Sequence, residues 1–421
     1  MKQFDTLYAR NSNNTINAWS ISVEPLENMK ALIHIVEGQL EGKETNTTRA
    51  VNKGKNIGKM NETTAYEQAC KEAQSRWEKK KKQGYKSLKD LNIDVENYKE
   101  EKPGDILTIN NAIEVSLPLN RTDANNLSKP MKAQPYFKDD GSVRIKFPCY
   151  GQSKLNGFRV MARWEKVKEN VGTLLETEVE KVVFRSKEGL RYDILEHIEK
   201  EFTKEMFSTI NIKGEQIEIV FDGEMYIPNE ILSEISSAVR KRNNKTEKLK
   251  FYIFDIAISE VNQKNRLQFL DEFRTLLINN SCKNILTVNS IKINSNEEAQ
   301  EFTDTCIKQG YEGAIFRDIN AEYQFGKRPQ TMVKLKRFQD KEFKIVDVVG
   351  GDNSPELGVF ICVQEQGLKF KVTPEGSQDI KKEYLSNKTK YIGKKLTVRF
   401  FERTKDNLPF HAVGTTIRDY E

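Results

Sequence analysis

Short runs of alternating hydrophobic and polar residues, separated by polar turns, fill the first part of the chain. They predict strands at residues 6–8, 19–23 and 32–36. A helical pattern follows Thr64, and Glu67 stands three residues further on, as in a capping box. We therefore expect residues 1–90 to form a small domain of one sheet and one helix.

A mixed pattern of strand and helix signals occupies residues 131–337. The predicted strands are 143–147, 155–162, 181–184, 216–221, 251–256 and 314–316. A helix is predicted over 191–207, because Ile194, Ile198 and Phe202 recur on one stripe. Residues 91–130 carry few apolar clusters, so we interpret them as a linker with some order near 109–119.

The pattern changes again over residues 338–421, where short apolar runs alternate with Gly, Pro and Asn turns. The predicted strands are 343–349, 358–363, 368–372, 395–401 and 412–417. Five short strands in about 80 residues indicate a small Greek-key barrel of the oligonucleotide-binding (OB) type. The whole chain is thus expected to be an α+β multidomain protein.

Composition narrows the class of protein without identifying it. The 68 Lys+Arg outnumber the 62 Asp+Glu, and a net charge of +6 is compatible with a polyanionic partner. No run approaches the roughly 18 apolar residues of a membrane span, so we expect no membrane partner. Five scattered cysteines fit neither a zinc site nor a disulfide framework, and favour a reducing, cytoplasmic compartment. The three histidines have no partner at ligand spacing, which argues against a histidine-based triad, and His197 is expected to be a packed side chain.

Candidate chemistry begins with the run Lys154-Leu155-Asn156-Gly157-Phe158-Arg159. Four motifs follow it in order: Asp222-Gly223-Glu224, Phe251-Tyr252-Ile253-Phe254-Asp255, Glu312-Gly313 and Lys334-Leu335-Lys336. A free lysine is protonated at pH 7 and cannot attack, but desolvation or nearby cations lower its pKa. Lys334 and Lys336 alternate with apolar residues, so both lie on one face of a strand, where an anion between them is expected.

In their order and spacing these motifs resemble the covalent nucleotidyltransferases, which include ATP-dependent DNA ligases, RNA ligases and mRNA capping enzymes. The closest likeness is to phage-type ATP-dependent DNA ligases. The resemblance implies an ATP-grasp-like adenylation domain at 131–337, followed by an OB-fold barrel at 338–421. It implies that Lys154 attacks the α-phosphate of ATP, that AMP passes to the 5′-phosphate of a nick, and that the 3′-hydroxyl then displaces AMP.

The same resemblance implies roles for individual residues. The implied nucleotide-binding set is Lys154, Asn156, Gly157, Arg159, Glu224, Tyr252, Phe254, Lys334 and Lys336. Either Tyr252 or Phe254 is expected to stack on adenine; both point the same way in a strand, so the pattern does not choose between them. Glu224 and Glu312 are the expected ligands of Mg²⁺ or Mn²⁺. Asn156 departs from the aspartate usual in the family.

The segment Arg185-Ser186-Lys187-Glu188-Gly189 partly matches the family's Ser-Arg-x-Gly element, with Lys187 in place of the arginine. Arg185 or Lys187 is therefore expected to contact the 5′-phosphate at the nick. The alternative is that the segment is a salt-bridged surface loop.

The segment from Gly54-Lys55-Asn56-Ile57-Gly58 through Gln83-Gly84-Tyr85 resembles the WGR type of domain found in proteins that respond to DNA breaks, although Ser20 follows Trp19 where the family has Gly-Arg. The alternative is an unrelated domain of one sheet and one helix. A lysine run closes the predicted helix: Lys79, Lys80, Lys81 and Lys82. Such a run either contacts DNA phosphates or only complements the helix dipole. The expected protein is a cytoplasmic monomer that seals nicked double-stranded DNA, in the host cytoplasm if it is phage-encoded.

Two alternatives stay open. The chain could be an RNA ligase or a capping-type nucleotidyltransferase, since these share the motifs. It could also be a catalytically inactive protein that binds nicks or ends, which Asn156 and the altered Ser-Lys-x-Gly element would favour.

Overall fold

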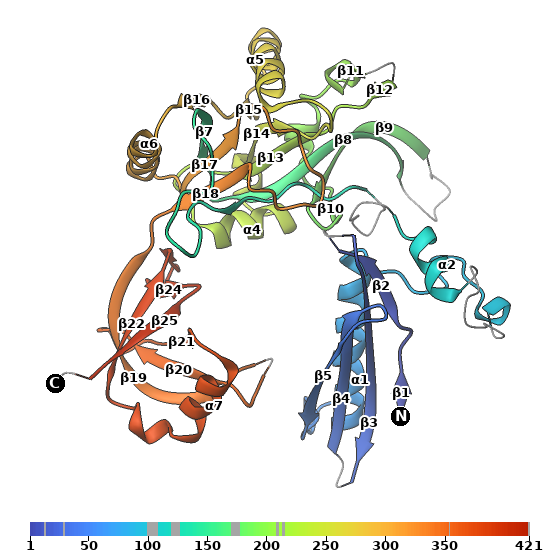
Figure 1. Cartoon of the computed structure of the whole chain (residues 1–421), viewed down its shortest axis with the longest axis vertical. Coiled ribbons are helices and arrows are strands. Elements are labelled where there is room, and N and C mark those ends of the chain that lie inside the picture. The colour runs from blue at the N-terminus through green and yellow to red at the C-terminus, as the bar shows by residue number, and fades with distance from the viewer. Residues whose placement is uncertain are drawn as a thin grey trace.

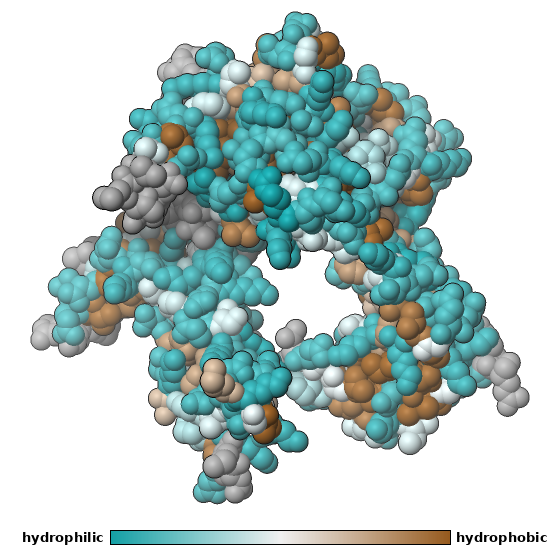
Figure 2. All heavy atoms as spheres, turned by 180° about the vertical axis from the view of Figure 1, so that it is seen from behind, coloured by the Kyte–Doolittle hydropathy of each residue, from teal (hydrophilic) through white to brown (hydrophobic). Residues whose placement is uncertain are grey.

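The computed structural model contains three lobes (Figure 1). It describes residues 1–11, 14–27, 30–98, 108–118, 127–169, 177–207, 210–212, 215–352 and 354–419. The N-terminal domain and the C-terminal barrel extend from the same side of a central domain, and the space-filling view shows an opening between them (Figure 2). Within the described residues, no helix has the length and apolar character needed to cross a membrane.

The N-terminal domain is an antiparallel sheet packed against one helix. Its elements are β1 (Lys2–Gln3), β2 (Leu7–Arg10), β3 (Ile16–Leu26), β4 (Lys30–Gln39), β5 (Glu44–Val51) and α1 (Ala65–Lys82). The predicted capping box is confirmed, because Thr64 Oγ1 accepts from the Glu67 N–H at 3.2 Å and the Glu67 carboxylate accepts from the Thr64 N–H at 2.9 Å. Strand β5 was not predicted, because its polar sequence has no apolar alternation.

The segment expected to be a linker is partly ordered against this domain. It contains a 3₁₀ turn (Val95–Tyr98) and α2 (Ile109–Ser116); α2 confirms the order predicted near 109–119, of which residue 119 lies outside the described residues. Ile113 packs with Ile16 of β3 in a small buried cluster. Arg10 donates to the carbonyl oxygen of Glu114 at 2.6 Å, so α2 is attached to the N-terminal domain by both packing and hydrogen bonds.

The central domain contains two main sheets and a two-stranded sheet formed by β11 and β12. The six-stranded sheet has the order β10-β9-β8-β13-β14-β15, and the five-stranded sheet has the order β16-β7-β17-β18-β6. The strands are β6 (Gln134–Pro135), β7 (Cys149–Lys154), β8 (Phe158–Glu169), β9 (Thr177–Ser186), β10 (Arg191–Tyr192), β11 (Ile210–Ile212), β12 (Glu215–Ile217), β13 (Phe221–Tyr226), β14 (Lys250–Ile256), β15 (Ile285–Thr287), β16 (Ser290–Ile293), β17 (Gly313–Asp318) and β18 (Met332–Lys336). The helices are α3 (Glu196–Glu199), α4 (Leu232–Arg240), α5 (Gln263–Asn279) and α6 (Asn296–Lys308), with 3₁₀ turns at Lys204–Phe207 and Thr246–Lys248.

Separate apolar clusters hold the two sheets. The larger cluster joins the six-stranded sheet to α3, α4 and α5, and includes Phe221 and Phe273. The second cluster joins the five-stranded sheet to α6. A small cluster contains Met161 of β8 and Met332 of β18, so it connects the two sheets. The site described below lies next to this connection.

Three predicted strands of the central domain need correction. Residues 143–147 form only an isolated bridge from Val143 to Phe137, because a turn through Gly141 precedes it and Pro148 follows it. The strand predicted at 155–162 is interrupted, and β8 begins only at Phe158. The strand predicted at 216–221 ends early, and β13 starts at Phe221, so Asp222, Gly223 and Glu224 lie inside a strand rather than after one.

The helix predicted over 191–207 is wrong in extent, because only α3 and the turn Lys204–Phe207 are helical. Ile198 and Phe202 are nevertheless buried, so two successive short turns bury the residues of the apolar stripe without one continuous helix. His197 is 7% exposed and its Nε2 lies 3.0 Å from the Leu249 carbonyl oxygen, which confirms a packed histidine.

The C-terminal domain confirms all five predicted strands. They are β19 (Gln339–Gly350), β20 (Gly358–Val363), β21 (Lys369–Pro374), β22 (Lys395–Phe400) and β25 (Val413–Arg418), and they pair in a closed ring. The elements not predicted are α7 (Gln378–Ser386), a 3₁₀ turn (Lys388–Lys390) and a hairpin of β23 (Glu402–Arg403) and β24 (Pro409–Phe410). Because β19 starts three residues after β18 ends, the barrel is joined directly to the strand that carries Lys334 and Lys336.

Truncation of Phe221 tests the central core. Phe221 is fully buried, with its ring centroid 4.6 Å from that of Phe273 and 5.1 Å from that of Phe207. Phe221→Ala should destabilise this domain by about 3–5 kcal/mol, because it removes a buried ring and leaves a cavity. Calorimetry should show a lower melting transition for the central domain alone. Ile278→Ala, at a position 70% exposed, is the control and should stay within about 0.5 kcal/mol; equal shifts in the two variants would contradict this view of the core.

Candidate active site

Lys154 is the last residue of β7, at the point where the chain leaves the five-stranded sheet for β8. Gly157 lies in this crossing, and a Cβ there would be 2.4 Å from the Met225 carbonyl oxygen. A residue without a side chain is therefore required for the chain to pass β13 so closely. The Lys154 side chain is 22% exposed and lines cavities on two sides.

Glu312 lies between two lysines. Its Oε2 accepts from Lys154 Nζ, its Oε1 pairs with Lys336 Nζ, and its side chain is 7% exposed. The Glu312 N–H also donates to the Lys154 carbonyl oxygen at 2.9 Å, which joins the start of β17 to the end of β7. On β18, Val333 and Leu335 are buried, which confirms that the lysines on either side of Leu335 share the other face.

The lysines of this cluster have lowered pKa values. Burial is the main cause for Lys154, and the charge of Arg159 lowers its pKa further while Glu224 opposes the change. Burial and the charge of Lys154 lower the pKa of Lys336 to about 8. The pKa of Lys334 falls for the same two reasons. A lowered pKa leaves a larger fraction of neutral amine near pH 7, as a lysine nucleophile requires.

Arg159 and Glu224 face each other across the pairing of β8 with β13. Arg159 donates to both carboxylate oxygens of Asp222, at 2.9 and 2.5 Å, and the buried Asp222 also accepts from the Tyr323 hydroxyl at 2.7 Å. Burial alone would lower the pKa of Arg159, but the charge of Asp222 raises it overall. Burial raises the pKa of Glu224 to about 7, against the opposing charges of Lys154 and Arg159.

Phe254 and Tyr252 have different surroundings although they share one face of β14. Two guanidinium groups lie near the Phe254 ring, with Arg159 Cζ and Arg317 Cζ each 5.5 Å from its centroid. Tyr252 instead packs edge-on against Tyr226, with the ring centroids 5.6 Å apart. Arg317 was not among the predicted residues; it is buried and donates to Asp255 at 2.7 Å, a contact across 62 residues that no local pattern reveals.

A cavity of about 330 Å³ lies beside Lys154 and collects most of the predicted nucleotide residues. Its predicted lining residues are Lys154, Arg159, Lys187, Glu224, Phe254 and Lys334, and those not predicted include Lys132, Arg317 and Arg328. This volume is within the range of small-molecule sites. The excess of cations over carboxylates favours an anionic ligand.

A second cavity, of about 580 Å³, lies on the other side of Lys154 and faces the barrel. Asn156, Gly157, Glu312 and Lys336 line it. The Asn156 side-chain amide donates to Glu402 of the β23–β24 hairpin at 2.7 Å, and Lys336 Nζ lies 5.0 Å from the ring centroid of Phe401. The barrel therefore supplies part of the site, which the motif analysis missed.

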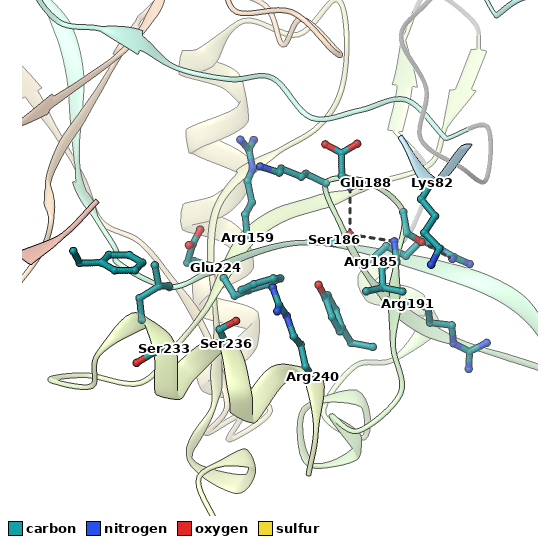
Figure 3. A pocket seen from close by; sticks show the side chains of 18 residues that line it. Lys82, Arg159, Arg185, Ser186, Glu188, Arg191, Glu224, Ser233, Ser236 and Arg240 are labelled. Atoms are coloured by element: carbon teal, nitrogen blue, oxygen red, sulfur yellow. Dashed lines mark hydrogen bonds between the residues drawn. The ribbon is translucent and has the colours of Figure 1, made fainter. Parts of the chain in front are cut away.

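A third cavity, of about 980 Å³, shares Gly157 and Glu224 with the second cavity and extends along β8 and β9 (Figure 3). The basic residues that line it are Lys82, Arg159, Arg185, Lys187, Arg191 and Arg240. Arg185 forms a two-point ion pair with Glu165, at 3.0 and 2.6 Å, as expected of the salt-bridged alternative. Lys187, in contrast, lines both this cavity and the one that contains Phe254.

The four lysines of the predicted run at the end of α1 have different surroundings. Lys80 pairs with Glu37 at 3.3 Å, and Lys81 pairs with Asp90 at 2.9 Å. Lys79 is exposed on the N-terminal domain. Lys82 lines the third cavity together with residues of the central domain.

The described residues contain no cluster of three or more His, Cys, Asp or Glu side chains placed to bind a metal. The two predicted metal ligands, Glu224 and Glu312, nevertheless both line the cavity between Lys154 and the barrel. Two carboxylates are enough for Mg²⁺ when substrate phosphates complete its coordination.

Fold and site together indicate an enzyme with a lysine nucleophile: Lys154, whose pKa is lowered, lines a cation-rich cavity of about 330 Å³, and a small barrel adjoins it. A family model described as ATP dependent DNA ligase domain matches residues 130–336, and one described as DNA ligase OB-like domain matches residues 350–418. The chain belongs to the family of ATP-dependent DNA ligases. Neither match reaches the N-terminal domain.

The relatives agree with this placement. A DNA ligase of African swine fever virus is 28% identical in an alignment 282 positions long that covers 59% of this chain and 65% of that protein. The DNA ligase of a second isolate is 26% identical in an alignment 394 positions long that covers 89% of this chain and 80% of the relative. The solved structure of a Lig E DNA ligase matches with a TM-score of 0.50 and 18% identity, over 68% of this chain and 98% of that one, which shows a shared fold.

Replacement of Glu224 tests the electrostatics around Lys154. Because the charge of Glu224 raises the pKa of Lys154, Glu224→Gln should lower that pKa further. The pKa of Glu224 is about 7, so the difference between variant and wild type should be small below pH 7 and grow above it. Acetylation of Lys154 as a function of pH, read by mass spectrometry, measures the shift. The exposed Glu301→Gln should leave the curve unchanged, and an unchanged curve for Glu224→Gln would refute the coupling.

Proposed function

We propose that this protein is a DNA ligase that uses ATP to seal nicks in duplex DNA through a lysyl-AMP intermediate. The observation that carries the proposal is the position of Lys154: its pKa is lowered, it shares Glu312 with Lys336, and it lines a cation-rich cavity of nucleotide size. Family membership supplies the reaction class, and the geometry supports Lys154 as its nucleophile.

In the first step, neutral Lys154 Nζ attacks the α-phosphorus of ATP. The bond from nitrogen to phosphorus forms, the bond from the α-phosphorus to the bridging oxygen breaks, pyrophosphate leaves, and the nitrogen loses a proton to water. Lys334 and Lys336 lie on one strand face close to Lys154, where they would neutralise the phosphate charge that develops. Phosphate oxygens would take the place of the Glu312 carboxylate beside the lysines.

Phe254 is the proposed adenine platform, because its ring lines the nucleotide-sized cavity and Tyr252 packs elsewhere. Arg159, held by Asp222, and Glu224 would bind the ribose. Asn156 would contact the nucleotide from the side of the cavity that faces the barrel, where its amide donates to Glu402 in this structure.

Glu224 and Glu312 are the residues that would hold Mg²⁺ or Mn²⁺. Both are carboxylates beside Lys154, and hard divalent cations prefer oxygen ligands. The cation, when bound, supplies charge neutralisation for the triphosphate. Binding it requires an ionised Glu224, whose pKa of about 7 makes the affinity rise with pH through that value.

In the later steps AMP moves from Lys154 to the 5′-phosphate at a nick, and the 3′-hydroxyl attacks this phosphate with loss of AMP. Lys187 is the proposed contact to the 5′-phosphate, because it lines both the nucleotide cavity and the larger basic cavity. Most affinity should come from phosphate contacts, since a ligase must accept any sequence. The WGR-like interpretation of the N-terminal domain remains part of this proposal, as a module that grips DNA.

Replacement of Lys154 tests the nucleophile. Lys154→Ala should form no covalent AMP with α-labelled ATP and Mg²⁺, whereas binding to a nicked duplex should persist. Lys154→Arg is the matched control that keeps a positive charge but should also form no adduct. Denaturing electrophoresis and intact mass give the readout. Covalent AMP on either variant would sink the assignment; an adduct of the wild type with GTP alone would favour a capping enzyme, and sealing confined to RNA would favour an RNA ligase.

The paired variants Phe254→Ala and Tyr252→Ala test the adenine platform. Loss of a stacked ring is worth about 1–3 kcal/mol, so Phe254→Ala should raise the KM for ATP in self-adenylation by roughly 5- to 100-fold. Tyr252→Ala should leave this KM within about twofold and lower thermal stability, because it removes a packing contact with Tyr226. A larger KM effect from Tyr252→Ala would reverse the assignment.

A further inference from the structure

Lys129 lies at the junction of the N-terminal and central domains, with a side chain only 1% exposed. Its Nζ donates to the Gln83 carbonyl oxygen at 2.5 Å and to Glu188 Oε2 at 2.7 Å. Gln83 directly follows α1, and Glu188 lies in the turn after β9. A buried ammonium that loses such partners is left uncompensated, so this contact strongly favours one arrangement of the two domains.

Two further features make the junction stiff. The carbonyl groups at the C-terminal end of a helix carry partial negative charge, so the ammonium of Lys129 is favoured beside Gln83. The backbone of Lys129 is held as well, because its carbonyl oxygen accepts from the Gly326 N–H at 2.6 Å. Lys129 therefore joins α1, the turn after β9 and the segment that follows β17.

Lys82 immediately precedes Gln83 and so lies at this junction. Lys82 is the last residue of α1, and its side chain lines the cavity of about 980 Å³ together with Arg240 of the central domain (Figure 3). Lys187 lines the same cavity. In the part of the chain that the structure describes, no carboxylate forms an ion pair with any of these three cations. The cavity thus combines cations from two domains.

The lining of the cavity suits a nucleic-acid strand. Phe158 and Tyr192 form an edge-to-face pair with ring centroids 5.7 Å apart, and Arg240 lies 5.3 Å from the Phe158 centroid. Tyr192 is buried and Phe158 is partly exposed, and cations beside an accessible aromatic ring are an arrangement that binds the phosphates and bases of a strand. Arg159 and Lys187 also line the nucleotide cavity, so a strand in this cavity would run directly past the adenylation site.

We propose that the N-terminal domain is a fixed wall of the DNA-binding site, in which Lys129 positions Lys82 to bind a backbone phosphate of the strand that carries the 5′-phosphate. The inference rests on the proposed ligase function. A flexibly tethered module would add DNA affinity independently of the central domain. In the proposed arrangement, the contribution of Lys82 to DNA affinity depends on the buried Lys129.

A double-mutant cycle tests the dependence. The four proteins are the wild type, Lys82→Ala, Lys129→Met and the double variant, and the probe is a nicked duplex with a 5′-phosphate, without ATP or metal. Lys82→Ala should weaken binding and reduce the slope of log K against log salt by about one, as expected for one lost phosphate contact. Lys129→Met should weaken binding at least as much, and adding Lys82→Ala to it should cause no further loss.

Lys71→Ala, an exposed lysine earlier on α1, is the matched control and should leave both affinity and salt slope unchanged. If Lys129→Met folds poorly, Glu188→Gln takes its place in the cycle. It removes the same ion pair by changing the partner of Lys129, and it should have the effect expected of Lys129→Met. Additive losses in the cycle, or an unchanged salt slope for Lys82→Ala, would overturn the inference. Failure of the wild type to form covalent AMP would instead overturn the proposed function, so the two failures can be told apart.

Discussion

The rest of the site depends on the ion pairs that the Glu312 carboxylate forms with Lys154 and Lys336. Lys154, Lys334 and Lys336 reach the same end of one sheet, where burial and mutual repulsion lower their pKa values. Repulsion between partly buried like charges is strong, so such a cluster is stable only with an anion among them. Glu312 supplies one oxygen to each of two lysines. The folded protein thus already contains a negative charge where the proposed reaction places a phosphate, and the site is organised before its substrate arrives.

Much of the fold could be predicted because its signals are local. The barrel strands, the capping box at Thr64 and the shared face of Lys334 and Lys336 depend only on alternation or on neighbours within one turn. The predicted helix over 191–207 was wrong because the same spacing of apolar residues fits more than one local structure. Ile198 and Phe202 have helical spacing, yet two short turns packed on a sheet bury them equally well.

The rest of the site depends on contacts that no local pattern contains. Tyr323 and Asp222, which hold Arg159, are 101 residues apart, and Lys129 and Glu188 are 59 residues apart. Alternation places Tyr252 and Phe254 on one face and cannot separate them; the difference comes from guanidinium groups on other strands. Motifs could therefore nominate six of the residues that line the cavity beside Lys154, whereas the residues that orient it emerge only from the folded chain.

The hydrogen bond from Asn156 to Glu402 makes two domains chemically dependent on each other. An aspartate at position 156 would set one carboxylate against another, and an apolar residue at position 402 would leave the amide without its acceptor. A change at either position thus favours a compensating change at the other. The barrel is for this reason not a freely exchangeable module, and co-variation of positions 156 and 402 among ligases with this hairpin would be the evolutionary trace of the contact.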